Sequence, residues 1–171
     1  MLRSFICGTS GLRELKEYIE SKVPKNYMVE LLVSEEAQVI QVIADNALVF
    51  DARLSQRTRE TYLNLQDPWV KEFARSELPI IENIIDIFEK KIECKAREVV
   101  IAYSYILDTM YILIHPINRC SALRVAFGTT KPTFEVVVSN CRVSSEEIQC
   151  DSEHLVEILK NIASIAKDIC R

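Results

Sequence analysis

Histidine is the first residue type to examine for proton-transfer chemistry at neutral pH, and this chain has only two. His115 directly precedes Pro116 at the end of an apolar run, and no acid or nucleophile near it in sequence would orient it as a general base. His154 stands beside Glu153 near the start of the last amphipathic segment, where a solvent-facing role is expected. We therefore predict structural or surface roles for both histidines, and a protein that is not an enzyme.

Cysteine chemistry is the second possibility, since six cysteines stand at positions 7, 94, 120, 141, 150 and 170. No C-x-x-C pair occurs, which argues against a zinc site. Their density is far below that of a disulfide scaffold, so free thiols in a reducing cytosol are expected. The alternative is a bridge between Cys141 and Cys150, in a hyperthermophile whose cytosolic proteins carry disulfides. Arg119 could activate Cys120, but no nearby histidine completes a catalytic dyad.

Two polar clusters could bind a ligand or a cation. The cluster near a predicted turn consists of Tyr103, Ser104, Tyr105 and Asp108. Tyrosines on adjacent strands are usually packing residues, so packing is the favoured interpretation. The acidic cluster consists of Glu146, Glu147, Asp151 and Glu153, and it lacks the spacing and the glycine of a calcium loop. With three glycines in all, the chain also lacks a phosphate-binding glycine-rich loop. We predict no metal and no cofactor.

Length and composition indicate one globular domain, residues 1–171, with a sizeable core. Hydrophobic residues make up 49% of the 171 positions and charged residues 27%. The net charge of −4 provides no overall basic field, so nucleic-acid binding is not expected. No signal peptide is recognised at the N-terminus, and no apolar run is long enough to span a membrane. We predict a cytoplasmic protein.

Periodicity and turn residues predict the elements that would position these side chains. Apolar residues at helical spacing predict helices over 12–23, over 68–75 and 77–94 with an interruption at Pro79, and over 152–170. Alternation predicts strands over 3–7, 27–33, 37–44 and 47–54, then a four-stranded antiparallel meander between residues 99 and 139. Asp45 and Asn46 form the expected hairpin turn. Residues 55–66 are expected to be an irregular surface loop, and 140–151 a polar connection.

The helix after Pro79 is the most apolar of these elements. Its isoleucines and Phe88 cover roughly 160° of the circumference, more than the ~100° that one sheet usually covers. We therefore predict a homodimer seam on this helix, and the candidate interface consists of Ile80, Asn83, Ile84, Ile87 and Lys91. The alternative is that the N-terminal or C-terminal helix of the same chain covers the surplus.

The order of elements resembles that of roadblock/LC7 domains, within the profilin-like architecture that also includes longin and sensor-type domains. The resemblance lies in the hairpin QVIQVIADNALVFDARL, the helix over 78–92, the segment AREVVIAYSYILDTMYILIHPINRCSALRVAFG and the last helix. It covers roughly residues 10–128 and 152–170. The chain departs from the family in lacking glycine at the hairpin turn, and in the strands over 27–33 and 133–139 and the insertion over 55–76.

The resemblance implies an α+β fold, with helices packed on an antiparallel sheet in the order helix, strands, helix, strands, helix. It also implies a non-enzymatic scaffold or protein-interaction module, with a small GTPase or a second copy as partner. One alternative is a ligand-sensing domain of related architecture, with an apolar pocket between the sheet and the helix over 155–169. The other is a nucleic-acid-processing factor.

Overall fold

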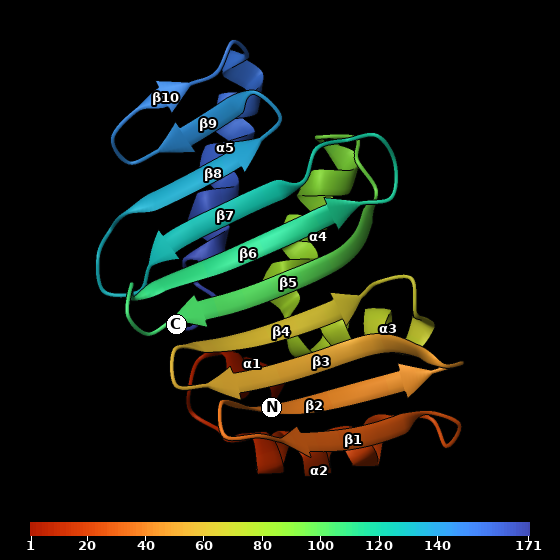
Figure 1. Cartoon of the computed structure of the whole chain (residues 1–171). Coiled ribbons are helices and arrows are strands. Elements are labelled where there is room, and N and C mark those ends of the chain that lie inside the picture. The colour runs from red at the N-terminus through yellow and green to blue at the C-terminus, as the bar shows by residue number, and fades with distance from the viewer.

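Ten strands follow one another across one antiparallel sheet in the computed structural model, which describes all 171 residues (Figure 1). The strands are β1 (Met28–Val33), β2 (Ala37–Ala44), β3 (Ala47–Ser55), β4 (Thr58–Asn64), β5 (Ala96–Ser104), β6 (Thr109–Pro116), β7 (Leu123–Gly128), β8 (Phe134–Val138), β9 (Cys141–Ser144) and β10 (Ile148–Gln149). Every strand pairs with its neighbours in sequence, as short connections between antiparallel strands allow.

All five helices lie on the same face of this sheet, behind it in the view of Figure 1. They are α1 (Leu2–Ile6), α2 (Leu12–Lys22), α3 (Pro68–Glu77), α4 (Pro79–Lys90) and α5 (Glu153–Ala166). Helix α2 packs on β1 to β3, α1 on β4 and β5, α3 on β4, α4 on β5, and α5 on β7 to β9. One cluster of 42 buried apolar residues fills the space between the two layers. The core is therefore one-sided.

Local signals fix several element boundaries where the sequence places them. Asp45 and Asn46 have φ angles of 52° and 62°, so the predicted tight turn between β2 and β3 is confirmed. Asp67 caps α3 by accepting a hydrogen bond from the Val70 N–H at 2.9 Å. Pro79 interrupts the helical run, and α4 restarts there, as predicted.

The predicted fold class is wrong, because the strands do not follow the roadblock/profilin-like order. They form a single open sheet in sequence order, and strands dominate the structure. Residues 55–66, predicted as a loop, contain β4, which joins the N-terminal strands to the later ones. Residues 3–7 lie mostly in α1, and the connection over 140–151 contains β9 and β10. The polar residues of β4 hide its alternation, since only Thr61 and Leu63 are buried there.

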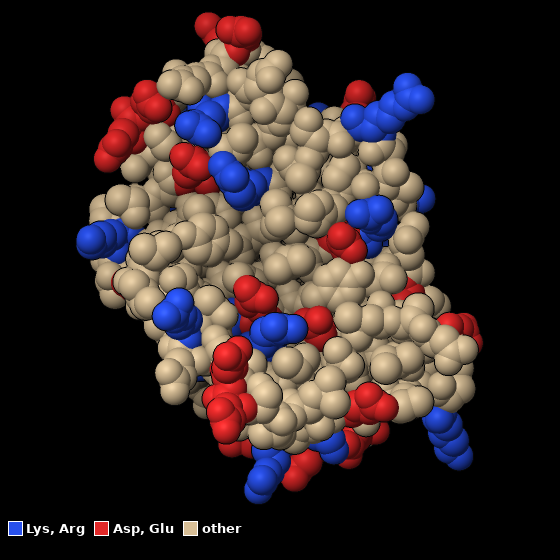
Figure 2. All heavy atoms as spheres, in the orientation of Figure 1, with Lys and Arg blue, Asp and Glu red and all other residues tan.

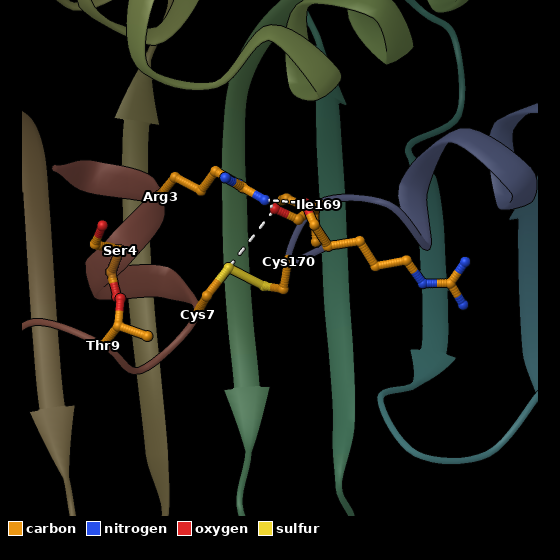
Figure 3. Close-up of a disulfide and its surroundings, with 7 residues drawn as sticks. Arg3, Ser4, Cys7, Thr9, Ile169 and Cys170 are labelled. Atoms are coloured by element: carbon orange, nitrogen blue, oxygen red, sulfur yellow. Dashed lines mark hydrogen bonds between the residues drawn. A yellow bond between two sulfur atoms is a disulfide. The ribbon is translucent and has the colours of Figure 1, made fainter.

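The cysteines form three disulfides, so the prediction of free thiols is wrong. They pair as Cys7–Cys170, Cys94–Cys120 and Cys141–Cys150, and none is left free. The third bridge is the alternative that the sequence left open. The first ties the end of α1 to the C-terminal segment, where Arg3 Nε also donates a hydrogen bond to the Ile169 carbonyl at 2.8 Å (Figure 3).

The disulfides should differ in their effect on stability. Cys7 and Cys170 are 163 residues apart, whereas Cys141 and Cys150 are 9 apart. Loop-closure entropy predicts about 5 kcal/mol for the long loop and about 2.7 kcal/mol for the short one. Replacing both cysteines of the first pair by alanine should therefore lower the free energy of unfolding by about 2 kcal/mol more than replacing those of the second. Urea denaturation measures this, and equal losses would contradict it.

Candidate functional site

The face of the sheet opposite the helices is uncovered across all ten strands, and we take it as the candidate functional site, the open face. Its side chains alternate with those buried under the helices, as the pleat of a strand requires. Strand pairing aligns one residue of each strand in a central row: Glu30, Gln41, Asp51, Tyr62, Val100, Leu113, Arg124, Val137, Arg142 and Gln149. A second row lies beside it: Leu32, Val39, Arg53, Glu60, Ala102, Tyr111, Ala126, Glu135 and Ser144.

The middle of the open face is apolar. On β5 and β6 the two rows hold Val100, Ala102, Tyr111 and Leu113, and on β7 they hold Ala126 beside the exposed Arg124. The five uncharged residues are half-buried among their neighbours. Figure 2 shows this as a band of uncharged atoms across the molecule, with charged side chains on both sides of it. A solvated face of an antiparallel sheet is usually polar, so this composition favours a surface that becomes covered.

Charges of opposite sign lie on the two sides of this apolar band. Glu30, Asp51 and Glu60 project from β1, β3 and β4, and none of them forms an ion pair. On the other side, Arg124 of β7 and Arg142 of β9 project from the same face. Both approach Glu135, at 3.4 and 3.8 Å, so two cations share one carboxylate. The central row is therefore acidic over the N-terminal strands and basic over the C-terminal ones, while the second row adds Arg53 to the first group and Glu135 to the second.

Asp51 is the most perturbed acid of the open face. Burial raises its pKa above the ordinary value of 3.8, and the charge of Glu60 raises it further, against the lowering effect of Arg53. The neighbouring Tyr62 donates a hydrogen bond to Glu98 Oε2 at 2.9 Å. Burial and this bond raise the pKa of Tyr62 to about 12, so it stays neutral. Asp51 is thus a partly desolvated carboxylate that forms no ion pair in its own chain, and the charge of Arg53 offsets only part of its desolvation.

The tyrosine cluster near residue 108 is a structural turn. Asp108, with φ at 47°, accepts hydrogen bonds from the hydroxyls of Thr129 and Thr130, and from Tyr103 at 2.6 Å. These three hydroxyls lower the pKa of Asp108 to about 2. The cluster therefore fixes the β5–β6 turn against the β7–β8 loop, which gives Asp108 a structural role.

The residues predicted as a dimer interface differ in how far they are exposed. Ile84 is buried in the core, Ile80 and Ile87 are half-buried against it, and Asn83 and Lys91 are exposed. Helices α3 and α5 lie on either side of α4, so most of its apolar perimeter is enclosed within the chain. The excess width of that face, which motivated the predicted seam, therefore has an intramolecular explanation.

The remaining candidates are also dispersed. His115 is half-buried on the open face opposite Glu98, and His154 is exposed at the start of α5. The acidic cluster of residues 146–153 is exposed, and no group of three potential ligands in the chain could hold a metal ion. Cys120 is bridged to Cys94 and cannot act as a thiol. Beneath α5, where a ligand pocket was an alternative, six residues of the helix are packed into the core.

Sequence reasoning missed the open face, although part of its signal was present. In β3, Asp51 and Arg53 alternate with the buried Phe50 and Ala52, which marks them as facing away from the helices. The register between strands, which places Asp51 in one row with Arg124, depends on all the pairings between them and cannot be obtained from any one strand.

Comparisons with models of protein families, with curated proteins and with solved structures give no match for this chain. None of the five helices combines the length and the apolar character needed to cross a bilayer.

The turn around Asp108 gives a pH-dependent prediction. Because its pKa in the folded protein is lowered from 3.8 to about 2, ionised Asp108 stabilises the fold above pH 3.8, and this contribution is lost as the pH falls towards 2. Asp108→Asn should therefore lower the urea midpoint at pH 7, by an amount that shrinks between pH 4 and pH 2. Asp45→Asn is the matched control, since Asp45 has a similar φ of 52° in another turn. The same pH-dependent loss in both variants would exclude the proposed cause.

Proposed function

We propose that the protein is a non-enzymatic protein-interaction module that forms a homodimer through the open face of its sheet. The observation that carries this proposal is the self-complementary order of charges in the central row. Asp51 lies on β3 and Arg124 on β7, each two strands from Val100 on β5. A two-fold axis along β5 therefore brings each acid over the arginine of the other copy.

The same axis gives further pairs in the central row. Two sheets packed face to face about it place β4 over β6, β3 over β7 and β1 over β9. Tyr62 of one copy then lies over Leu113 of the other, and Glu30 over Arg142. Because the contacts of a two-fold dimer are reciprocal, each of these pairs occurs twice.

The size of the open face suits a stable dimer. Ten strands spaced about 4.8 Å apart span roughly 40 Å, and five or six residues per strand span roughly 17 Å. The resulting footprint, about 700 Å² per copy, is close to that of an ordinary specific interface. Packed sheets cross at about 30°, which displaces residues on strands far from the axis more than residues on strands close to it. Asp51 and Arg124 are the inner charged pair, and they therefore give the sharper test.

Electrostatics favour this occupant over an unrelated acidic or basic partner. A partner of one sign would meet repulsion at one end of the central row, whereas an inverted second copy meets attraction at both ends. The cation supplied by the second copy would also compensate the desolvation of Asp51. A small GTPase as partner rests only on the resemblance to roadblock/LC7 domains, and no contact surface of this structure supports it.

The disulfides indicate the kind of cellular compartment in which such a dimer would be found. Three bridges that use every cysteine favour an oxidising compartment, or the cytosol of a hyperthermophile, in which protein disulfides persist. The cytoplasmic location predicted from the sequence is therefore compatible with this proposal only if the protein comes from a hyperthermophile.

A charge exchange tests the dimer. Asp51→Arg and Arg124→Asp should each place two like-charged pairs in the interface and weaken dimerisation by about 30-fold or more. The double variant restores both pairs with the signs exchanged, and it should recover most of the affinity. Sedimentation equilibrium over a concentration series measures the dissociation constant, and urea denaturation checks that each variant is folded.

Lys71→Glu is the control, because Lys71 is exposed on α3, on the helical side of the molecule. It should leave the dissociation constant unchanged. A wild-type chain that is monomeric at all concentrations, or a double variant no better than the single ones, would overturn the proposal.

A further inference from the structure

Arg59 of β4 is a half-buried cation without a partner. Its side chain points to the helical side of the sheet, away from the open face, and its guanidinium carbon lies 5.4 Å from the ring centre of Phe5 and 5.6 Å from that of Tyr105. It belongs to no ion pair and forms no hydrogen bond, and its Nε is buried without an acceptor. The aromatic rings hold the guanidinium plane in place.

Such an arrangement is uncommon in a folded protein. Buried guanidinium donors are normally paired, because desolvation without a partner costs free energy. Asp108 is bonded to Tyr103 and Thr129, which lie near Arg59, and to Thr130, and it forms no bond with Arg59. The guanidinium of Arg59 is therefore a positively charged donor group held in place by aromatic rings. The carboxylate of Asp108 is bonded to other residues and does not pair with it.

The guanidinium borders a cavity of about 270 Å³. Six of its nine lining residues are aliphatic, aromatic or disulfide-bonded, and the other three are Arg59, Gly8 and Thr129. Gly8 has φ at +85°, and a Cβ there would lie 2.6 Å from Arg59 Nη1, so the backbone approaches the cation closely. Cys7 and Cys170 also line the cavity, and their disulfide holds this wall together (Figure 3).

We infer that this cavity binds a small organic monocarboxylate, whose carboxylate pairs with Arg59 and whose apolar body contacts the cavity walls. A carboxylate matches the planar fork of a guanidinium with two parallel hydrogen bonds. The single cation and the nearby charge of Asp108 favour a monoanion over a phosphate dianion. The volume, at the lower end for ligand pockets, limits the body to about the size of one ring. The inference is independent of the dimer, since Arg59 and the open face lie on opposite sides of the sheet.

Sodium benzoate and its neutral isostere benzamide are suitable probes, titrated into the oxidised full-length protein with two-dimensional NMR as readout. Benzoate should shift resonances of residues 6–8, 103–105 and 129 saturably, and should bind at least tenfold more tightly than benzamide. Arg59→Gln should reduce benzoate affinity at least tenfold and leave benzamide affinity unchanged. Arg57→Gln is the matched control, because Arg57 is exposed in the preceding turn.

Urea denaturation checks that the variants fold, and Arg59→Lys provides a second test. This variant keeps the charge but loses the fork, so it should bind benzoate with intermediate affinity. Equal binding of the two probes, an equal loss in Arg57→Gln, or no saturable shift up to about 10 mM benzoate would each overturn the inference. The dissociation constant of the dimer should be unaffected by Arg59→Gln, so failure of either proposal is distinguishable from failure of the other.

Discussion

The structure depends on covering a ten-stranded sheet from one side only. Each helix has one apolar face, and all five faces are turned toward the same side of the sheet. This single layer of contact buries the core, and it brings α1 and the C-terminal segment, from opposite ends of the chain, onto adjacent parts of the sheet. The Cys7–Cys170 bridge then secures the contact between the two ends of the chain, which is costly to form because it closes a very long loop.

One-sided coverage also determines what the other side must do. Half of the residues of every strand face away from the helices, and β5 and β6 place Val100, Tyr111 and Leu113 there. If solvent were the only neighbour of that face, polar residues would serve at these positions at no cost to the core. Folding alone therefore does not require either the apolar band or the separated charges of this face.

Local periodicity was sufficient for some elements and insufficient for the sheet. The hairpin at Asp45 and Asn46, the break at Pro79 and the last amphipathic helix follow from interactions within a few residues, and sequence analysis located them. The order of strands across the sheet, the pairing of cysteines and the neighbours of α4 are determined by contacts between distant segments. The wide isoleucine face is the clearest case, since its width was real but its cover came from α3 and α5. The residues of the open face could be assigned to one side of each strand, but not to rows.

The strand that sequence analysis took for a loop connects these observations. In β4, Arg59, Thr61 and Leu63 point to the helices, while Glu60 and Tyr62 point to the open face. Leu63 is the only large aliphatic residue among them that is fully buried, which leaves β4 too polar to be recognised from its own sequence. A strand in the middle of a sheet is hydrogen-bonded to neighbours on both edges, so β4 is held in the sheet although few of its side chains are apolar. The polar residues that prevented β4 from being predicted as a strand therefore include the cation Arg59 on the helical side of the sheet and the acid Glu60 on the open face.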